Sequence, residues 1–355
     1  MLVDPASLSN PNELPEAKAR HSVVFRGREG QSQFNLHSYL AYFDKKFWAM
    51  WSSSRIREED PDQFLRYATS VDGHHWSEAR SLADDPDGRD GPVRWIARGL
   101  FVLDGKLNAL GALVESADYS KRGRDVVWKN LRLMRFEWDG KKWQPRGVLA
   151  DDCMNNFPPG RVGGLWMMPC RDSRMNVYMA ASSVLEPAGW KRTPVASEPP
   201  FHRMDEPSWY EAPDGTVHLI IRDNAKSGFL IRAVSRDRGK SWEMPVLTNY
   251  PDATSKNFAG RLSSGVLFLI NNPNQKQRDP LAISFSKDGW LFENPVAVRR
   301  QAAPSRYGRR NRTTGSFQYP HAIEQNGSIW VIYSTNKEDI EVSELPLRSL
   351  RMPVR

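Results

Sequence analysis

The segment Ser235-Arg-Asp-Arg-Gly-Lys-Ser-Trp242 brings together three residue types that favour a tight hairpin turn. An aspartate side chain accepts hydrogen bonds from nearby backbone N–H groups, and glycine adopts a positive φ at little cost. The tryptophan can then pack back onto the sheet. Residues 229–234, which precede the segment, form a β-like run. The segment therefore predicts a turn that joins two strands.

Three further segments repeat this pattern in shorter or degenerate form. They are Ser70-Val-Asp-Gly-His-His-Trp76, Ser286-Lys-Asp-Gly-Trp290 and Phe136-Glu-Trp-Asp-Gly-Lys-Lys-Trp143. Most copies follow a β-like run, so the four together indicate an internal repeat rather than chance hairpins. The pattern is the Asp-box or BNR repeat, and the chain resembles the sialidase superfamily of β-propellers.

Six segments of the chain begin with polar residues, continue as an apolar run and end at a turn. They start near residues 34, 95, 158, 205, 257 and 317, at intervals that suit one four-stranded blade each. We therefore expect an all-β fold, a six-bladed β-propeller, with residues 23–25 as the outer strand of the last blade. Seven blades are the alternative if residues 107–143 contain another. We expect an N-terminal strap over residues 1–20 and a single sialidase-like propeller domain over residues 21–350.

The composition limits the class of protein and its partners. Of the 355 residues, 39% are hydrophobic, and no apolar run approaches the length of a membrane span. The net charge of +8 favours an anionic partner. Most aromatic residues belong to the repeat turns and strands, so we expect an acidic oligosaccharide or polysaccharide substrate rather than nucleic acid. We find no motif for a metal or a cofactor.

Two features leave alternatives open. Cys153 and Cys170 are the only cysteines, and they can form one bridge or remain two buried thiols. Residues 1–10 lack a secretory signal pattern. The protein is therefore expected in the cytoplasm, or in the periplasm or outside the cell if a leader was removed.

The first residues of the innermost strands of a propeller face its central funnel, where ligand chemistry collects. The six segment starts offer the polar side chains Asn35, His37, Arg98, Arg161, Glu206, Arg261, Tyr319 and His321. Arginine and histidine predominate, and Glu206 is the one carboxylate. Because arginine grips a carboxylate or sulfate through two hydrogen bonds, this surface suits an anionic ligand.

The resemblance to sialidases covers residues 30–347 and includes individual site residues. In that family a glutamate is followed about sixteen residues later by an arginine of the substrate-carboxylate triad, as Glu206 is followed by Arg222. Arg278 corresponds to another triad arginine, and Tyr319 corresponds to the nucleophilic tyrosine. The chain departs from the family at Asn35, which stands where the first triad arginine should be. The acid/base aspartate of the family also has no clean counterpart.

The segment Asn35-Leu-His37 is similar to the first blade of a smaller set of sialidase-like propellers that carry a lone catalytic histidine. They act on rhamnose linked to glucuronate, some as rhamnosidases and some as lyases. The resemblance implies His37 as the catalytic base. Hydrolysis normally uses two carboxylates about the bond, and only Glu206 is expected in the funnel, which favours elimination.

We therefore expect an enzyme that cleaves a terminal glycosidic bond in an acidic glycan, a rhamnosyl-glucuronate lyase or rhamnosidase. The expected catalytic residues are His37, Tyr319, Glu206 and His321. The expected substrate-binding residues are Asn35, Arg98, Arg161, Arg222, Arg261 and Arg278. An exo-α-sialidase with Tyr319 as its nucleophile is the second hypothesis. A propeller that only binds glycan or protein is the third.

Overall fold

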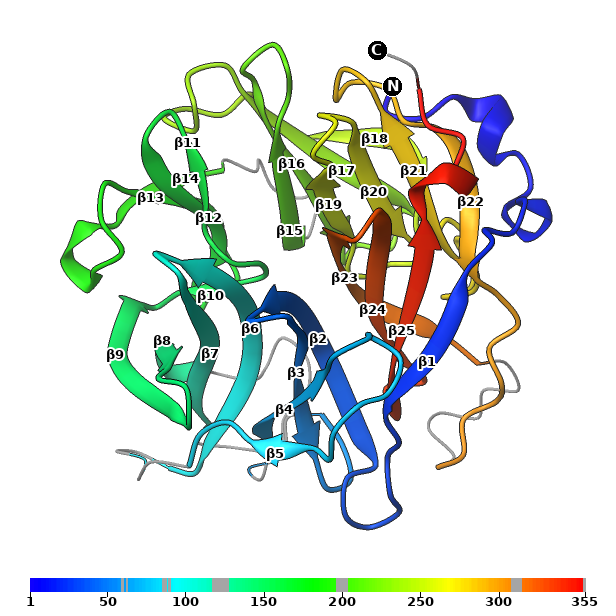
Figure 1. Ribbon diagram of the computed structural model, residues 1–355. Helices are drawn as coiled ribbons and strands as arrows, with labels where there is room; N and C mark the ends of the chain where they lie inside the picture. Colours follow the sequence, from blue (N-terminus) through cyan, green and yellow to red (C-terminus); the bar gives the residue numbers. More distant parts are fainter. Residues whose placement is uncertain are drawn as a thin grey trace.

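The computed structural model arranges the strands in six antiparallel sheets around a central axis (Figure 1). It describes residues 1–58, 61, 63–84, 88, 91–116, 128–195, 204–307 and 315–353. Each sheet is one blade, which confirms the six-bladed β-propeller. Strands β7 (Lys106–Ser116) and β8 (Trp128–Trp138) pair with each other inside the second blade, where a seventh blade would have had to start. The propeller is therefore six-bladed rather than seven-bladed.

In blades 1, 2, 4 and 5 the strands follow one another in the sequence, from the axis outward. Blade 1 contains β2 (Phe34–Phe43), β3 (Lys46–Ser54), β4 (Phe64–Ser70) and β5 (Arg80–Ser81). Blade 2 contains β6 (Val93–Leu103), β7, β8 and β9 (Trp143–Asp151). Blade 3 contains β10 (Met154–Asn155), β11 (Gly160–Val162), β12 (Leu165–Arg171), β13 (Val177–Ser182) and β14 (Lys191–Pro194).

The second half of the ring repeats the same plan. Blade 4 contains β15 (Met204–Glu211), β16 (Val217–Asp223), β17 (Phe229–Ser235) and β18 (Val246–Pro251). Blade 5 contains β19 (Phe258–Arg261), β20 (Leu267–Asn271), β21 (Leu281–Ser286) and β22 (Glu293–Arg299). Blade 6 contains β23 (Phe317–Gln325), β24 (Ser328–Thr335), β25 (Asp339–Pro346) and β1 (Arg20–Phe25). Short 3-10 helices occur at Pro5–Leu8, Pro11–Glu13, Pro187–Gly189 and Leu347–Ser349.

Strand β1 closes the ring from the other end of the chain. It pairs antiparallel with β25, and the register runs from Arg20 opposite Glu344 to Phe25 opposite Ile340. Figure 1 shows β1 (blue) beside β25 (red). The prediction that residues 23–25 supply the outer strand of the last blade is confirmed.

Each of the four Asp-box segments forms the turn between the third and fourth strands of its blade. In the complete copy, Asp237 Oδ1 accepts hydrogen bonds from the backbone N–H groups of Lys240 at 3.0 Å and Ser241 at 2.9 Å. Gly239 has a φ of +82°, a conformation that favours glycine. The repeat in the sequence is therefore one local hairpin, formed at the same place in four blades.

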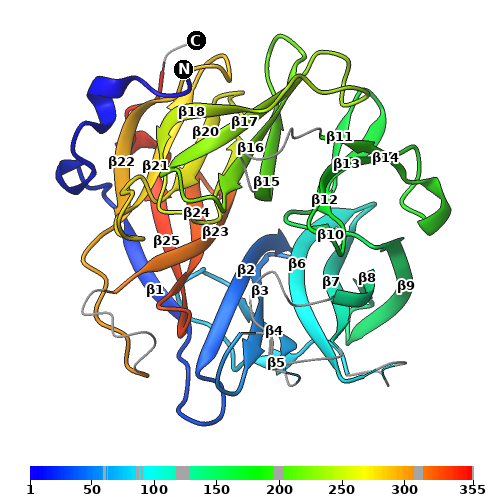
Figure 2. The same ribbon diagram turned by 180° about the vertical axis from the view of Figure 1, so that it is seen from behind.

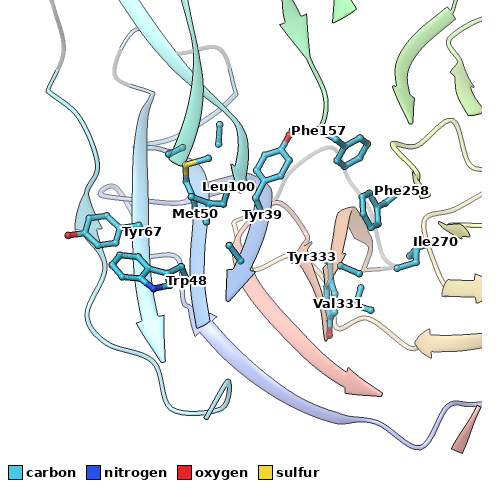
Figure 3. Close-up of a cluster of buried hydrophobic side chains, with 14 of the residues drawn as sticks. Tyr39, Trp48, Met50, Tyr67, Leu100, Phe157, Phe258, Ile270, Val331 and Tyr333 are labelled. Atoms are coloured by element: carbon cyan, nitrogen blue, oxygen red, sulfur yellow. The ribbon is translucent and has the colours of Figure 1, made fainter. Parts of the chain in front are cut away.

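Aromatic rings fill the axis of the propeller. The largest buried hydrophobic cluster contains Trp48 between blades 1 and 2 and Tyr333 in blade 6 (Figure 3). Tyr39, Phe157 and Phe258 belong to the same cluster and lie at the axis. The ring centroids of Phe157 and Phe258 are 4.8 Å apart, and those of Tyr39 and Phe157 are 6.2 Å apart. These rings pack beneath the polar side chains described below.

The N-terminal segment packs on the outside of blades 4 and 5 (Figure 2). Leu2, Val3, Leu8 and Leu14 are buried there, and Val3 forms a parallel bridge with Phe292. Burial of four aliphatic side chains holds this segment on the ring. The limits given above for the strap and for the propeller domain stay predictions.

Cys153 and Cys170 form a disulfide bond, the first of the two alternatives left open by the sequence. The bond links the start of blade 3 to its strand β12. In the part of the chain that the structure describes, no helix has the length and apolar character needed to cross a membrane.

Candidate active site

Four innermost strands among the described residues carry a β-bulge; the bulge in β6 contains Arg98, and each of the other three contains one expected catalytic residue. The pairing register shifts around His37 in β2, around Glu206 in β15 and around Tyr319 in β23. Their φ angles are +53°, +47° and +57°. A non-glycine residue in this region costs about 1–3 kcal/mol and tends to occur at functional sites. The bulges redirect these three side chains out of the strand pairing.

The His37 and Tyr319 rings are in direct contact. Their centroids are 4.7 Å apart and their planes meet at 70°, an edge-to-face arrangement. His37 Nδ1 shares a hydrogen bond of 3.3 Å with Ser52 Oγ, which also accepts the Ala97 N–H at 2.8 Å. The Ser38 hydroxyl donates to the backbone oxygen of Tyr319 at 3.2 Å. Blades 1, 2 and 6 therefore fix this pair of rings together.

The electrostatic surroundings keep both rings uncharged at neutral pH. Burial, together with the positive charges of Arg98 and Lys256, lowers the pKa of His37 well below its ordinary value. Burial and the negative charge of Glu206 raise the pKa of Tyr319. The site thus places a neutral imidazole, able to accept a proton, beside a phenol that still carries one.

Two adjacent carboxylates near the rings are held in ion pairs. Glu206 accepts a hydrogen bond from Arg222 at 2.7 Å, and Asp205 forms an ion pair with Arg171. Asp205 also accepts the Asn224 amide at 2.6 Å. Burial alone would raise the pKa of Glu206, but the charges of Arg222 and Arg171 outweigh it and hold that pKa at about 2. Glu206 is therefore an anion over the whole physiological pH range.

Arg278 lies beside Arg222, and its partners in the structure are neutral. It donates to Gln318 Oε1 at 2.9 Å and to the backbone oxygen of Thr254 at 2.8 Å. Burial and the neighbouring charge of Arg222 lower the pKa of Arg278. Two guanidinium groups that repel each other next to Tyr319 form a place where a ligand carboxylate would be stabilised.

Two lysines that the sequence analysis missed also lie around His37 and Tyr319. Lys256 Nζ donates to the Tyr39 hydroxyl at 3.0 Å and lies 4.4 Å from the centroid of the Phe157 ring. Lys337 Nζ donates to Glu58 Oε2 at 2.6 Å and lies 5.4 Å from the centroid of the Tyr319 ring. Lys256 directly precedes the strand start predicted near residue 257, and this position could have indicated a residue of the site. Lys337 and Glu58 come from connecting segments. Residues 52–60 contain candidate carboxylates for the acid/base residue, but the sequence singles out neither Glu58 nor Lys337.

The family of the chain follows from its repeats. The model of the BNR repeat-like domain matches residues 45–332, most of the chain. The chain belongs to the BNR repeat-like family. Comparison with curated proteins gave no match.

Solved structures share the sialidase-like propeller fold of this BNR repeat-like protein. A protein of unknown function from Dyadobacter fermentans has a TM-score of 0.69 and 16% identity, over 94% of this chain and 99% of that one. A sialidase has a TM-score of 0.65 and 18% identity, over 94% of this chain and 33% of that one. The NanB sialidase from Streptococcus pneumoniae has a TM-score of 0.66 and 10% identity, over 93% and 71%. The chain thus spans about a third of the first sialidase, and at these identities the likeness shows the fold alone.

His321 and Asn35 are two further residues that the sequence predicts at the site of this BNR repeat-like propeller, and the structure places them in different environments. His321 lies among Tyr39, Phe157 and Phe258, and burial lowers its pKa to about 3. Its ring borders an axial cavity of about 410 Å³ lined mainly by apolar side chains. Asn35 is fully buried, and its amide donates to the backbone oxygens of Ser32 and Glu338.

The structure does not place Arg161 and Arg261 among the residues around His37 and Tyr319. Arg161 is exposed and stacks over Trp166, with 4.6 Å between its guanidinium carbon and the ring centroid. Arg261 is exposed at the end of β19, away from the beginning of that strand. Among the described residues, no cluster of three or more His, Cys, Asp and Glu side chains is arranged to hold a metal ion.

Proposed function

We propose that this BNR repeat-like propeller cleaves a terminal bond in an acidic glycan by elimination at a uronate, with His37 as base and Tyr319 as acid. The observation that carries the proposal is the contact between the His37 and Tyr319 rings beside Arg222 and Arg278. The resemblance of the first blade to propellers that act on rhamnose linked to glucuronate suggests glucuronate as the uronate and rhamnose as the end group.

The reaction assigns one task to each group. Arg222 and Arg278 bind the uronate carboxylate and so make the C5 proton more acidic. His37 Nε2 takes that proton, while its Nδ1–H donates to Ser52. The electron pair of the C5–H bond forms a C4=C5 double bond, and the C4–O bond breaks. The leaving oxygen takes the proton of the Tyr319 phenol.

The substrate itself would strengthen the base. In the free protein, Arg98, Lys256 and Lys337 all lower the pKa of His37. A bound carboxylate offsets part of this positive charge and raises that pKa again. His37 would therefore become an effective base only when an anionic substrate is in place, which restricts the chemistry to acidic glycans.

The state of the carboxylates supports elimination over hydrolysis by two carboxyl groups. Such hydrolysis needs one carboxylic acid that still holds its proton. The expectation that Glu206 is the one carboxylate is wrong, because Asp205 and Glu58 also lie at the site. Each of the three is paired with a cation; burial alone would raise the pKa values of Glu206 and Glu58, but the charges of Arg222 and Lys337 lower them. A rhamnosidase in which His37 activates water would use the same residues and give a saturated product.

An exo-α-sialidase is the second candidate, and it is favoured by one observation. Arg222 and Arg278 flank Tyr319, and the charge of Glu206 acts on its phenol, as the Tyr nucleophile mechanism requires. The ion pair of Glu206 with Arg222 makes Glu206 a weak base for that tyrosine. A propeller that only binds glycan or protein would have the same fold without turnover.

The test is to incubate the protein with a rhamnose-capped glucuronate glycan and follow the ultraviolet absorbance of the conjugated double bond. The unmutated protein should give a steady rise that His37→Ala abolishes. His21→Ala is the matched control, because His21 lies on the outer strand β1, bonded to Ser343. Free rhamnose without an absorbance rise would indicate the hydrolase. Free sialic acid from a sialoside would indicate the second candidate, and binding without any product would indicate the third.

A further inference from the structure

Arg98 is a buried cation whose partners are neutral. It is 2% exposed, and its Nη1 donates to Asn156 Oδ1 at 3.3 Å. Its Nε is buried and has no hydrogen-bond partner. Within the described ranges, Arg98 forms no ion pair, whereas the nearby Arg171 and Arg222 each have a carboxylate. Burial of a charge without a counterion is costly, which makes such a residue a candidate for binding an anion.

Lys256 lies next to Arg98 and shares this condition. The Asn156 that accepts from Arg98 also accepts from Lys256 Nζ, through its backbone oxygen at 3.2 Å. The other partner of Lys256 is the neutral Tyr39 hydroxyl. Burial and the charge of Arg98 lower the pKa of Lys256 well below its ordinary value, and both side chains lower the pKa of His37. Two buried cations therefore lie side by side, and Glu206 is the carboxylate whose charge reaches both.

Arg98 lies across the ring from Arg278, whereas Lys256, which directly precedes β19 of blade 5, reaches Asn156 from the Arg278 side. Arg98 belongs to β6 in blade 2 and Arg278 to the β20–β21 connection in blade 5, which face each other in a ring of six. Glu206 and Tyr319 interact electrostatically with both arginines. Exposure also differs across the site: Arg98 is buried, whereas the Lys337 and Glu58 side chains are 23% and 33% exposed.

We propose that Arg98 and Lys256 form a second anion-binding position at the buried end of the funnel, so that the substrate carries two negative groups. One group is the uronate carboxylate at Arg222 and Arg278. The other is a carboxylate or sulfate on the sugar across the reacting bond. This inference rests on the proposed function, because it uses that function to name the first group. It narrows the substrate class to a doubly acidic glycan end.

Calorimetric titration of the full chain tests the second position. The probes are a rhamnosyl-glucuronate disaccharide, the same disaccharide with one sulfate on the rhamnose, and a disaccharide of two glucuronates. All proteins carry His37→Ala so that the ligands are not consumed. The doubly charged probe that fits should bind about tenfold tighter than the singly charged one, which is typical of one added charge-assisted contact. The two doubly charged probes show whether sulfate or carboxylate is preferred.

Variants then show which residue causes the preference for the doubly charged probe. Arg98→Gln should remove the preference, so that the singly and doubly charged disaccharides bind with equal affinity. Arg161→Gln, an exposed arginine outside the group, should retain it in full. Arg98→Lys keeps a positive charge and should retain part of it, which separates a charge effect from misfolding.

Three results would overturn the inference: equal affinity for singly and doubly charged probes, a preference unchanged in Arg98→Gln, or no binding of any probe. A failure of the proposed function can be distinguished from a failure of this inference. If Arg98→Gln loses the preference but the unmutated protein makes no unsaturated product, the second anion position stands and the elimination is rejected. If product forms without any preference, the elimination stands and the second position is rejected.

Discussion

Replacing Arg222 by methionine should destabilise the protein strongly at neutral pH, because it leaves Glu206 charged and buried. Glu206 is 4% exposed, and Arg222 lies 2.7 Å from its carboxylate. Methionine keeps much of the length of the arginine side chain but cannot donate hydrogen bonds or carry charge. The variant therefore removes the ion pair while it retains packing.

The size of the effect follows from the pKa of Glu206. That pKa is about 2 in the folded protein, against an ordinary value of 4.5. A difference of this size corresponds to about 3 kcal/mol of stability, which is present above the ordinary pKa and lost as the pH falls towards 2. Removing one partner of a buried pair typically costs about 3–5 kcal/mol. We therefore expect Arg222→Met to lower the free energy of unfolding by roughly 3 kcal/mol at pH 7.

Urea denaturation at pH 7 and pH 4 measures this change in Arg222→Met, Glu206→Gln and the double variant. The loss in Arg222→Met should shrink at pH 4, because Glu206 without its partner takes up a proton more readily. The double variant should be more stable than Arg222→Met, since no uncompensated charge remains. The exposed pair of Arg236 and Glu243, 2.6 Å apart, is the control, and Arg236→Met should cost under about 1 kcal/mol. Equal losses for the buried and exposed pairs, or a loss independent of pH, would refute the reasoning.

Two further predictions concern the repeat turn and the backbone at the site. Hydrogen bonds from Ser241 lower the pKa of the exposed Asp237 to about 2. Because water screens an exposed carboxylate, Asp237→Asn should lower stability by only about 1 kcal/mol at neutral pH, and the difference should disappear as the pH falls from about 4 to 2. Urea midpoints across that range check it, and a constant difference would contradict it. Gly99 has a φ of +149°, and a Cβ there would lie 2.5 Å from Pro158 Cγ. Gly99→Ala should lower stability by about 1–3 kcal/mol, more than Gly105→Ala, whose added Cβ would meet no atom within 4 Å; equal thermal shifts would argue against a clash.

The fold could be predicted from the sequence because the repeated unit is local. An Asp-box turn is made by side chains within a few residues of one another, so its composition alone indicates the hairpin. Residues 235–242 and their three relatives locate the third and fourth strands of four blades. The apolar runs then locate the inner strands to within a few residues. The pairing of β1 with β25 could also be predicted, because the last blade needs an outer strand.

The candidate site could be predicted only in part, because its residues depend on backbone detail and on distant segments. Polar residues near strand starts identified His37 and Tyr319, although the positive φ that directs them could not be seen. Arg161 fits the same pattern but lies in β11, beside the path that the other inner strands follow. Glu58 and Lys337 meet across almost the whole length of the chain. No local pattern predicts such a pair.

The closure of the ring by β1 has a consequence for synthesis of the chain. Strand β1 leaves the ribosome well before its partner β25, which is more than 300 residues further along the chain. At roughly 5–20 residues per second, β1 waits on the order of tens of seconds for that partner. During this time its edge is free to pair with other nascent chains. The last blade, which contains the strand that carries Tyr319, is therefore completed only after β25 has been synthesised.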